Sequence, residues 1–309
     1  MIVFLNKFSN YGQAGRKWEK VLPELESRGL AGDYTLIADM ENLPASLSQG
    51  IASGQYVVVA AGGDGTVNFV LNALMSLTEE ERKQLVLGAV GLGSSNDFHK
   101  PYSQSHLVNG RVFFKLDSVN TQPHNVGCID FEDDQGRDHR RYFLINASVG
   151  IIAEANHLFN SGDSVINWMK PRYVLGAIYY AALKTILRAP NIPATIRVGE
   201  ETLTTDITCL SILINPNFSG NLSYNLDVNG RSDYFGVVLC EKMGVGERVS
   251  VFYSIMKRKF QGGPKTRIWK TRQIEIQPLE TVALEMDGEV YLARNIRIRL
   301  LQAALRVCS

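Results

Sequence analysis

The chain has few cysteines, almost no net charge and no long apolar run. Its four cysteines, Cys128, Cys209, Cys240 and Cys308, are scattered over 309 residues without a C-x-x-C pair. This spacing argues against the usual zinc motifs and a disulfide framework, and it is typical of reduced thiols in a cytoplasmic protein. Because the formal net charge is +1, the chain has no overall positive field to attract nucleic acid.

The apolar segments are too short to cross a bilayer. The most apolar helix candidate, Tyr173 to Leu183, is about half of the ~20 residues that a membrane-spanning helix needs. An apolar strand begins at Ile2 and leaves no room for a signal peptide. We therefore expect a cytoplasmic protein without a transmembrane segment, which can meet a membrane only at its surface.

The order of the predicted elements indicates two domains. With 45% hydrophobic and 20% charged residues, the composition is that of a globular protein with a substantial core. Up to about residue 115, strands alternate with helices, which predicts a doubly wound parallel sheet. The strands are expected at 2–5, 34–38, 56–61 and 87–90, and the helices at 16–28, 43–53 and 67–77.

From residue 125 the pattern changes to short strands separated by turns. This pattern predicts a β-rich domain, either a sandwich or a barrel-like fold. Its strands are expected at 141–148, 195–198, 208–215, 235–240, 271–276 and 282–286. Two helices interrupt them, at 170–187 and 246–259. We interpret the first of these helices, with Trp168, Tyr173 and Leu183 in and around it, as part of the core.

The most informative segment is a glycine turn between a buried strand and a helix. The apolar run that ends at Ala61 continues as Gly62-Gly63-Asp64-Gly65-Thr66. Glycines allow positive φ angles and let a ligand approach the main chain closely. The N–H groups of such a turn and the helix dipole favour a phosphate. A purely structural turn is the alternative, but the added aspartate and threonine favour phosphate binding.

Two further strands run into similar loops. Gly93-Ser94-Ser95-Asn96-Asp97 follows the strand at 87–90, and Asn6 to Asn10 follows the first strand. Because parallel strands place their carboxyl ends at one edge of the sheet, we expect the three loops to converge there. Neither the P-loop motif nor the dinucleotide fingerprint occurs in the chain.

These loops, together with a late Met286-Asp287-Gly288-Glu289, have the order and spacing found in diacylglycerol-kinase-type lipid kinases. The chain resembles this family, which includes bacterial diacylglycerol kinases, sphingosine kinases and ceramide kinase, over nearly its whole length. The resemblance implies a nucleotide-binding α/β domain at 1–120, to which the segment 295–309 returns. It also implies a β-rich lipid-substrate domain at 121–294 and an active site in the cleft between the two domains.

The resemblance further implies ATP and Mg²⁺ as cofactors. Asp287 and Glu289 become the catalytic candidates, since a kinase acting on a hydroxyl needs a carboxylate to accept the proton; which of the two is the base stays open. Asp64 is the metal candidate beside the phosphates, and Asp233 is the candidate for a structural Mg²⁺. The predicted nucleotide-binding residues are Asn6, Ser9, Asn10, Gly62, Gly63, Asp64, Gly65, Thr66, Val67, Asn68, Gly93, Ser94 and Asn96.

The predicted activity is ATP-dependent phosphorylation of a lipid hydroxyl. Two alternatives stay open: a NAD-kinase-like phosphotransferase, and an inactive nucleotide- or lipid-binding regulator on the same fold. The second is motivated by departures from the family pattern at Ala38, Phe69, Asn125 and Ile152; Gly91, where the family has a proline, also departs from that pattern. The motifs do not identify the lipid.

The expected partner is a lipid substrate at a membrane surface, with no nucleic acid; whether the chain forms a homodimer stays open. One stretch concentrates positive charge without an acid: Lys257, Arg258, Lys259, Lys265, Arg267, Lys270 and Arg272. Such a run is usually a solvated face. For an enzyme with a lipid substrate it is also a candidate for weak, salt-sensitive contact with anionic headgroups.

Overall fold

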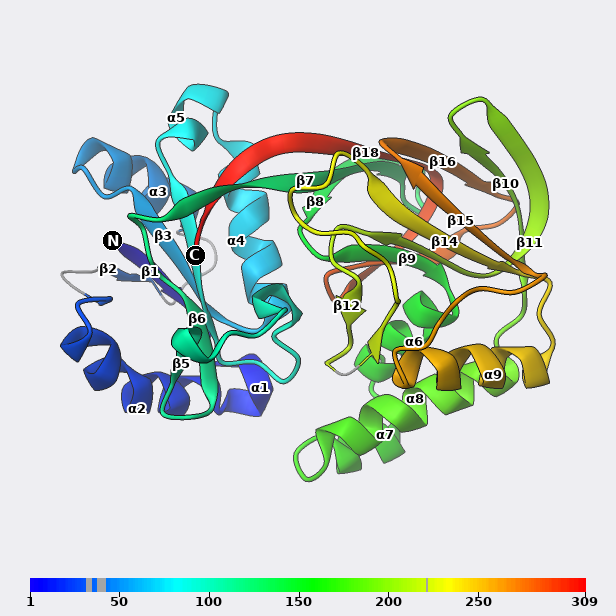
Figure 1. Ribbon diagram of the computed structural model, residues 1–309, viewed down its shortest axis with the longest axis horizontal. Helices are drawn as coiled ribbons and strands as arrows, with labels where there is room; N and C mark the ends of the chain where they lie inside the picture. Colours follow the sequence, from blue (N-terminus) through cyan, green and yellow to red (C-terminus); the bar gives the residue numbers. More distant parts are fainter. Residues whose placement is uncertain (32–34, 38–42, 221) are drawn as a thin grey trace. The chain divides into compact units, whose positions relative to one another are not determined.

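The computed structural model describes residues 1–31, 35–37, 43–220 and 222–309. Its chain divides into two compact units (Figure 1). Unit 1 comprises Met1–Val126 and Gln302–Ser309, and unit 2 comprises Gly127–Leu301. The prediction placed the boundary at residue 120 and the return segment at 295. The division between the units falls within two long strands, β7 (Thr121–Glu132) and β18 (Glu289–Cys308), and in β7 it lies next to the change of sequence pattern at residue 125.

Unit 1 is built on the parallel sheet that the sequence predicts. Its strands lie in the order β4-β3-β1-β2, and β1, β3 and β4 are largely buried, as expected for parallel strands covered on both faces. Val3 and Leu5 pack with Trp18 of one helix, whereas Phe4 meets Phe69 of another, 5.1 Å between ring centroids. The helices therefore cover both faces, and the doubly wound α/β fold class is confirmed. The main elements are β1 (Ile2–Leu5), β2 (Thr35–Ile37), β3 (Val57–Gly62), β4 (Val86–Gly91), α2 (Ala14–Ser27), α3 (Leu43–Ala52) and α4 (Asp64–Ser76).

Short elements complete unit 1. The end of β18 pairs in parallel with β4, through Arg306 opposite Val86, and β6 pairs with β4 in the antiparallel direction. The remaining elements are α1 (Ser9–Gly12), α5 (Glu79–Lys83), η1 (Asp97–His99), η2 (Gln104–His106), β5 (Leu107–Val108) and β6 (Val112–Lys115). Of the predicted strand at 34–38, Tyr34 and Ala38 lie outside the described residues.

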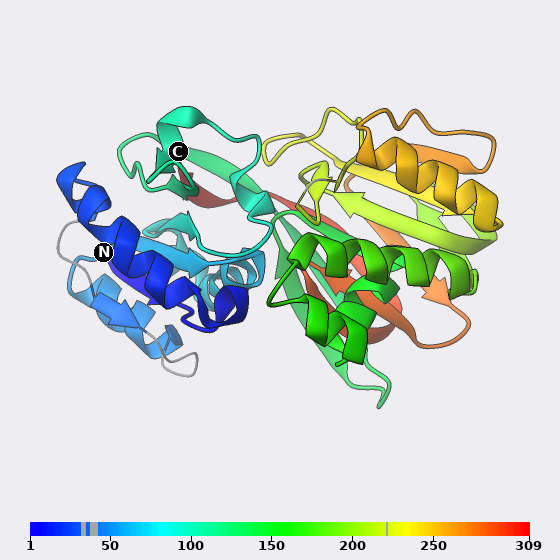
Figure 2. The same cartoon turned by 90° about the horizontal axis from the view of Figure 1, so that it is seen from below.

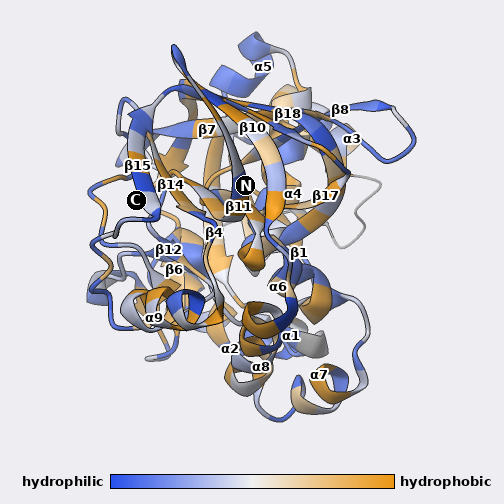
Figure 3. Ribbon diagram, turned by 90° about the vertical axis from the view of Figure 1, so that its right-hand side faces the viewer, coloured by the Kyte–Doolittle hydropathy of each residue, from blue (hydrophilic) through white to orange (hydrophobic). Residues whose placement is uncertain are grey.

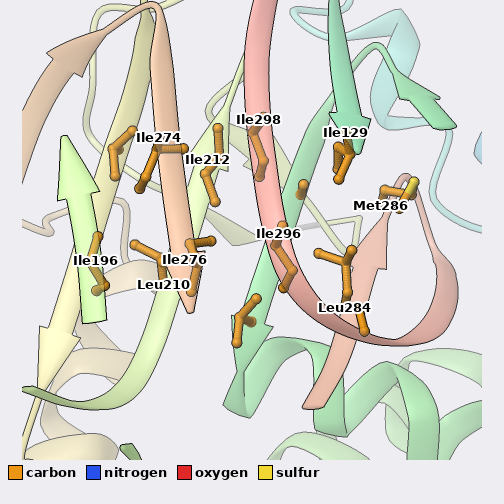
Figure 4. Packing of buried hydrophobic residues seen from close by; sticks show 14 of the residues in the cluster. Ile129, Ile196, Leu210, Ile212, Ile274, Ile276, Leu284, Met286, Ile296 and Ile298 are labelled. Carbon is orange, nitrogen blue, oxygen red and sulfur yellow. The ribbon is translucent and has the colours of Figure 1, made fainter. Parts of the chain in front are cut away.

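Unit 2 is β-rich, as predicted. Six strands pair in a closed series, in the order β9, β11, β10, β16, β18 and β17, and β17 pairs again with β9. The series can close because β11 and β18 are long and pair with different strands along their length. Isoleucines from facing strands, among them Ile196, Ile212 and Ile296, fill the space inside (Figure 4). The strands are β8 (Asp138–Phe143), β9 (Asn146–Gly150), β10 (Ile192–Val198), β11 (Glu201–Leu213), β12 (Asn217–Phe218), β13 (Leu222–Ser223), β14 (Phe235–Glu241), β15 (Thr266–Thr271), β16 (Gln273–Pro278) and β17 (Val282–Met286).

Two predicted strands of unit 2 are wrong in their bounds. The segment 141–148 is divided between β8 and β9, because the N–H groups of Leu144 and Ile145 donate hydrogen bonds to the carboxylate of Asp287 and not to a neighbouring strand. The segment 271–276 straddles the end of β15 and the start of β16. Side-chain-to-backbone bonds over such a sequence separation leave no trace in a local hydrophobic pattern.

Four helices accompany these strands: α6 (Ile151–Asn160), α7 (Ser164–Met169), α8 (Val174–Arg188) and α9 (Val245–Met256). The sequence predicted α8 and α9 but neither α6 nor α7. The interpretation of α8 as a core helix holds for one side only: Ala177 and Ala181 belong to a buried cluster, whereas Leu183 and Leu187 are 51% and 53% exposed. Within the described part of the chain, no helix is both long enough and apolar enough to cross a membrane.

Candidate functional site

The ends of β1, β3 and β4 meet at one edge of the unit 1 sheet. The N–H of Asn6 donates to the carbonyl of Ala61 at 3.1 Å, and the N–H of Leu92 donates to the carbonyl of Gly62 at 2.7 Å. The parallel register places Gly62 opposite Gly91. The loops that follow these strands therefore converge, as the sequence predicted.

The two glycine loops touch backbone against backbone. A Cβ atom added to Gly93 would lie 2.4 Å from the Cα of Gly63, and one added to Gly62 would lie 2.2 Å from Oγ1 of Thr66. None of the glycines at 62, 63, 65 and 93 has a positive φ, so the expected conformational reason for glycine is wrong here. At positions 62 and 93 glycine is required because no space remains for a side chain.

Thr66 joins the loop after β3 to the loop after β1. Its buried hydroxyl oxygen accepts from Nδ2 of Asn6 at 3.2 Å and shares a 3.1 Å hydrogen bond with the hydroxyl of Ser9. Asn10, one residue further, takes a left-handed conformation with φ of 52°. The predicted residues Asn6, Ser9 and Thr66 are thus brought together by direct contacts.

Asp64 and Asn96 shape the second glycine loop. Asp64 is the first residue of α4, and its Oδ1 accepts from the N–H of Phe98 at 3.0 Å. Asn96 has φ of 54°, and its side chain accepts from the N–H and donates to the carbonyl of Gly93. Ser94 is exposed at the tip of this loop. Asp64 therefore ties the start of α4 to the segment after the second loop.

Two further predicted nucleotide-binding residues lie inside α4 and are buried. Val67 and Asn68 are only 3% and 4% exposed. Both the main-chain carbonyl and the Oδ1 of Asn68 accept from Nδ2 of Asn72, one helical turn on. The buried Asn68 therefore has a hydrogen-bond partner within its own helix, Asn72.

Sequence reasoning missed Lys17, which lies in α2. Its ammonium donates to the carbonyl of Leu92, directly before Gly93, at 3.3 Å, and partial burial lowers the pKa of Lys17. A cation next to the glycine loops suits a phosphate ligand. The only sequence signal was its place shortly after the first loop.

The acidic motif of unit 2 forms a two-residue hairpin turn between β17 and β18. Met286 pairs with Glu289, and Asp287 and Gly288 both have positive φ, 48° and 93°. Such turns favour Asp-Gly, because both central residues must leave the usual φ range. The motif is therefore a tight β-turn between two paired strands.

The carboxylate of Asp287 is buried and accepts three backbone hydrogen bonds. Leu144 donates to its Oδ2 at 2.8 Å, and Ile145 and Asn146 donate to Oδ1 at 2.9 and 3.1 Å. The neighbouring Glu285, also buried, accepts from Ser148 Oγ and from the N–H of Gly288. These contacts hold the turn in place; the sequence analysis did not single out Glu285.

Glu289 differs from Asp287 in its surroundings. The residue is exposed, yet nearby protein atoms displace enough water to raise the pKa of its carboxyl above the usual range. A carboxylate with a raised pKa accepts a proton more readily near neutral pH.

The fit to metal ions is uneven. Mg²⁺ in phosphoryl-transfer sites usually takes one or two carboxylates plus phosphate oxygens, a role that Asp64 at the loop edge suits. Among the residues that the structure describes, no group of three or more histidine, cysteine or acidic side chains is arranged to hold a metal. Asp233 is exposed, and its main-chain carbonyl accepts from Arg272; the structural Mg²⁺ site at Asp233 stays a prediction.

Two departures from the family pattern have packing explanations. Phe69 stacks near Phe4 of β1. At Gly91, a Cβ would come within 3.0 Å of the Asn96 side chain and 3.1 Å of His99. These substitutions fit the local core and leave the loop contacts intact.

Comparisons with known proteins agree with this geometry. Residues 1–109 match the diacylglycerol kinase catalytic domain. A diacylglycerol kinase of Staphylococcus carnosus (strain TM300) is 21% identical over 89% of this chain and 83% of its own length. One from Staphylococcus aureus (strain bovine RF122 / ET3-1) is 21% identical over 93% and 85%.

The fold is shared with solved structures. A diacylglycerol kinase from Bacillus anthracis str. Sterne superposes with a TM-score of 0.66 at 16% identity, covering 99% of this chain and 95% of that one. A second structure from the same organism gives 0.73 at 19% identity, covering 99% and 94%. Residues 1–109 therefore resemble the diacylglycerol kinase catalytic domain, and the staphylococcal diacylglycerol kinases align with most of the sequence.

Proposed function

We propose that the protein is a lipid kinase that transfers the γ-phosphoryl group of ATP to the hydroxyl of a diacylglycerol-like lipid. The observation that carries the proposal is the backbone contact of the two glycine loops at the start of α4. Helix N-termini and closely packed glycine loops bind phosphates through main-chain N–H groups. The match of residues 1–109 to the diacylglycerol kinase catalytic domain supports kinase activity, and we propose the phosphate donor and the lipid in addition.

In this proposal unit 1 binds the nucleotide. The phosphates lie over Gly63 and Gly93, near the hydroxyls of Ser9 and Thr66, and the ammonium of Lys17 offsets their charge. Asp64 is the residue that would hold Mg²⁺, and the ion would supply positive charge to offset the negative charge that develops during transfer. Gly62 and Gly93 keep the loops close enough for one phosphate chain to contact both.

The two carboxylates of unit 2 take different roles. Asp287 is a positioning residue, since its oxygens are already committed to three N–H groups. Glu289 is exposed and has a raised pKa, so it is the better acceptor for the proton of the lipid hydroxyl. We therefore assign general-base catalysis to Glu289.

The test supplies the purified protein with γ-labelled ATP and Mg²⁺. Separate reactions contain detergent-dispersed diacylglycerol, a panel of other hydroxylated lipids, and NAD. The proposal expects label in a lipid. Label in NAD alone would replace it with the NAD-kinase-like alternative, and nucleotide binding without turnover on any acceptor would replace it with the inactive regulator.

A further inference from the structure

Two helices of unit 2 expose apolar stripes to solvent. On α8 these are Leu175, Leu183 and Leu187, and on α9 they are Val249, Tyr253 and Met256, each at least 37% exposed. The α9 residues are four and three positions apart, and the α8 residues are eight and four apart, so each set lies on one side of its helix. We call these six residues the helical apolar face. Figure 3 shows that hydrophobic residues are prominent on these helices.

The two stripes form one continuous surface. Tyr179 of α8 and Phe252 of α9 meet edge to face, 6.4 Å between ring centroids, and the two helices run side by side in Figures 1 and 2. Buried Arg248 of α9 donates to the carbonyls of Ile186 and Ala189 at the end of α8. This anchoring fixes the helices, so the face is a preformed feature of the fold.

The composition of α8 is unusual for a helix with a solvent-facing side. Its only charged residues are Lys184 and Arg188. A helix that is apolar nearly all round is normally buried, and a contiguous exposed apolar patch usually marks an interaction site.

Cations and aromatic rings border this face. Lys257 lies 5.6 Å from the ring of Tyr253 at the end of α9, followed by exposed Arg258 and Lys259. Just before α8 begins, Arg172 lies 5.3 Å from the ring of Trp168, which is 63% exposed. Tyrosine and tryptophan are the residues preferred at the boundary between lipid and water.

The basic run expected from the sequence does not act as one surface. Lys265 is paired with Glu247 at 2.7 Å and Arg267 with Glu241 at 2.9 Å, on or beside the edge strand β15. Charges on an edge strand also protect it from pairing with other chains. The three cations at 257–259 adjoin the helical apolar face instead.

We propose that the helical apolar face docks the protein on the surface of a bilayer that contains anionic lipids. The occupant is a membrane, because an apolar centre bordered by cations complements acyl chains bordered by negative headgroups. The helices lie in the interface and do not span it. The biological role of this contact rests on the proposed lipid kinase function, but the contact itself is independent of catalysis.

The experiment measures sedimentation of the full chain with large vesicles of phosphatidylcholine alone or with a quarter phosphatidylglycerol. The variant L183Q/L187Q keeps good helix formers and should weaken binding to the anionic vesicles about 100-fold, from the loss of two buried leucine side chains. The matched control L279Q/V119Q removes two aliphatic residues that are 81% and 88% exposed outside these helices, and it should bind like the parent.

A second pair separates local charge from net charge. K257Q/K259Q should weaken binding about 30-fold, because each cation near an anionic surface is worth about fivefold in partitioning. K20Q/R111Q removes the same net charge from exposed positions of unit 1 and should leave binding unchanged. If both variants lose the same amount of vesicle binding, the effect comes from net charge alone. That result would overturn the assignment of Lys257 and Lys259 to the membrane-binding face.

The proposal is overturned if L183Q/L187Q binds anionic vesicles as tightly as the parent. It is also overturned if the parent ignores all vesicles and instead forms dimers that the same substitutions abolish, since the face would then bind a second copy. Turnover on detergent-dispersed diacylglycerol should persist in L183Q/L187Q. If the parent phosphorylates no lipid, the proposed function fails, while vesicle binding still decides the docking surface.

Discussion

The glycine loops of unit 1 and the acidic turn of unit 2 are both short motifs, but they are held in opposite ways. The loops depend on missing side chains: Gly62 and Gly93 are glycines because Thr66 and Gly63 occupy the space where a Cβ would lie. The turn depends on a side chain that is present, because the carboxylate of Asp287 accepts hydrogen bonds from three N–H groups of a segment more than 140 residues earlier. A motif residue can therefore be indispensable to a fold without touching a substrate.

The largest expected effect is on the stability of unit 2. Asp287→Ala would leave three buried N–H groups without their acceptor, at about 1–3 kcal/mol for each unsatisfied group. Glu289→Gln, two residues away and exposed, should change the free energy of unfolding by less than about 0.5 kcal/mol. Denaturant unfolding followed on the unit 2 transition measures both. If the two variants have similar free energies of unfolding, Asp287 does not have the structural role that distinguishes it here from Glu289.

A smaller effect is expected at the glycine loops. Gly93→Ala forces the added Cβ against the Cα of Gly63, and overpacking of this kind typically costs about 1–3 kcal/mol. Gly246→Ala is the matched control, because this glycine is helical and has no atom within 4 Å of its added Cβ; it should be neutral or stabilising by about 0.5–1 kcal/mol. Thermal unfolding and ATP binding by calorimetry report the difference. If Gly93→Ala unfolds and binds ATP like the parent, the loops are not in the contact described.

The smallest effect concerns pH. The raised pKa of Glu289 means that the folded protein holds this proton more tightly than the unfolded chain. The carboxyl therefore destabilises the fold slightly as pH rises from the unfolded to the folded pKa, and Glu289→Gln should remove that loss at neutral pH. As the base, Glu289 must be ionised, so the parental kcat/KM should fall on the acid side at a pH above the normal glutamate range. An acid limb at the ordinary glutamate pKa would argue for another base.

The sequence predicted the elements whose signals are local. The β-branched run before Gly62 and the alternation of strands and helices led directly to the parallel sheet and to the meeting of three strand ends. The order of the three motifs led to the family. The reason assigned to the glycines was wrong, because a close contact between two loops 30 residues apart cannot be distinguished by composition from a need for positive φ.

Contacts between residues far apart in the sequence could not be predicted from local sequence patterns. The break between β8 and β9 follows from a bond to Asp287, and the location of Lys17 against Leu92 joins segments 75 residues apart. The exposure of Leu183 and Leu187 was equally hidden, since an apolar helix facing solvent has the same sequence pattern as one in a core. Asp64, Asp287 and Glu289 thus stay predicted functional residues, now with distinct surroundings.

The most direct measurement compares ATP binding and phosphoryl transfer in Glu289→Gln. The account predicts that Kd for ATP stays at the parental value, because the nucleotide is assigned to unit 1. It predicts that kcat on a diacylglycerol-like lipid falls by about 10²–10⁴, the usual contribution of a general base. Parental turnover in this variant, with the fold intact, would contradict the assignment of catalysis to Glu289.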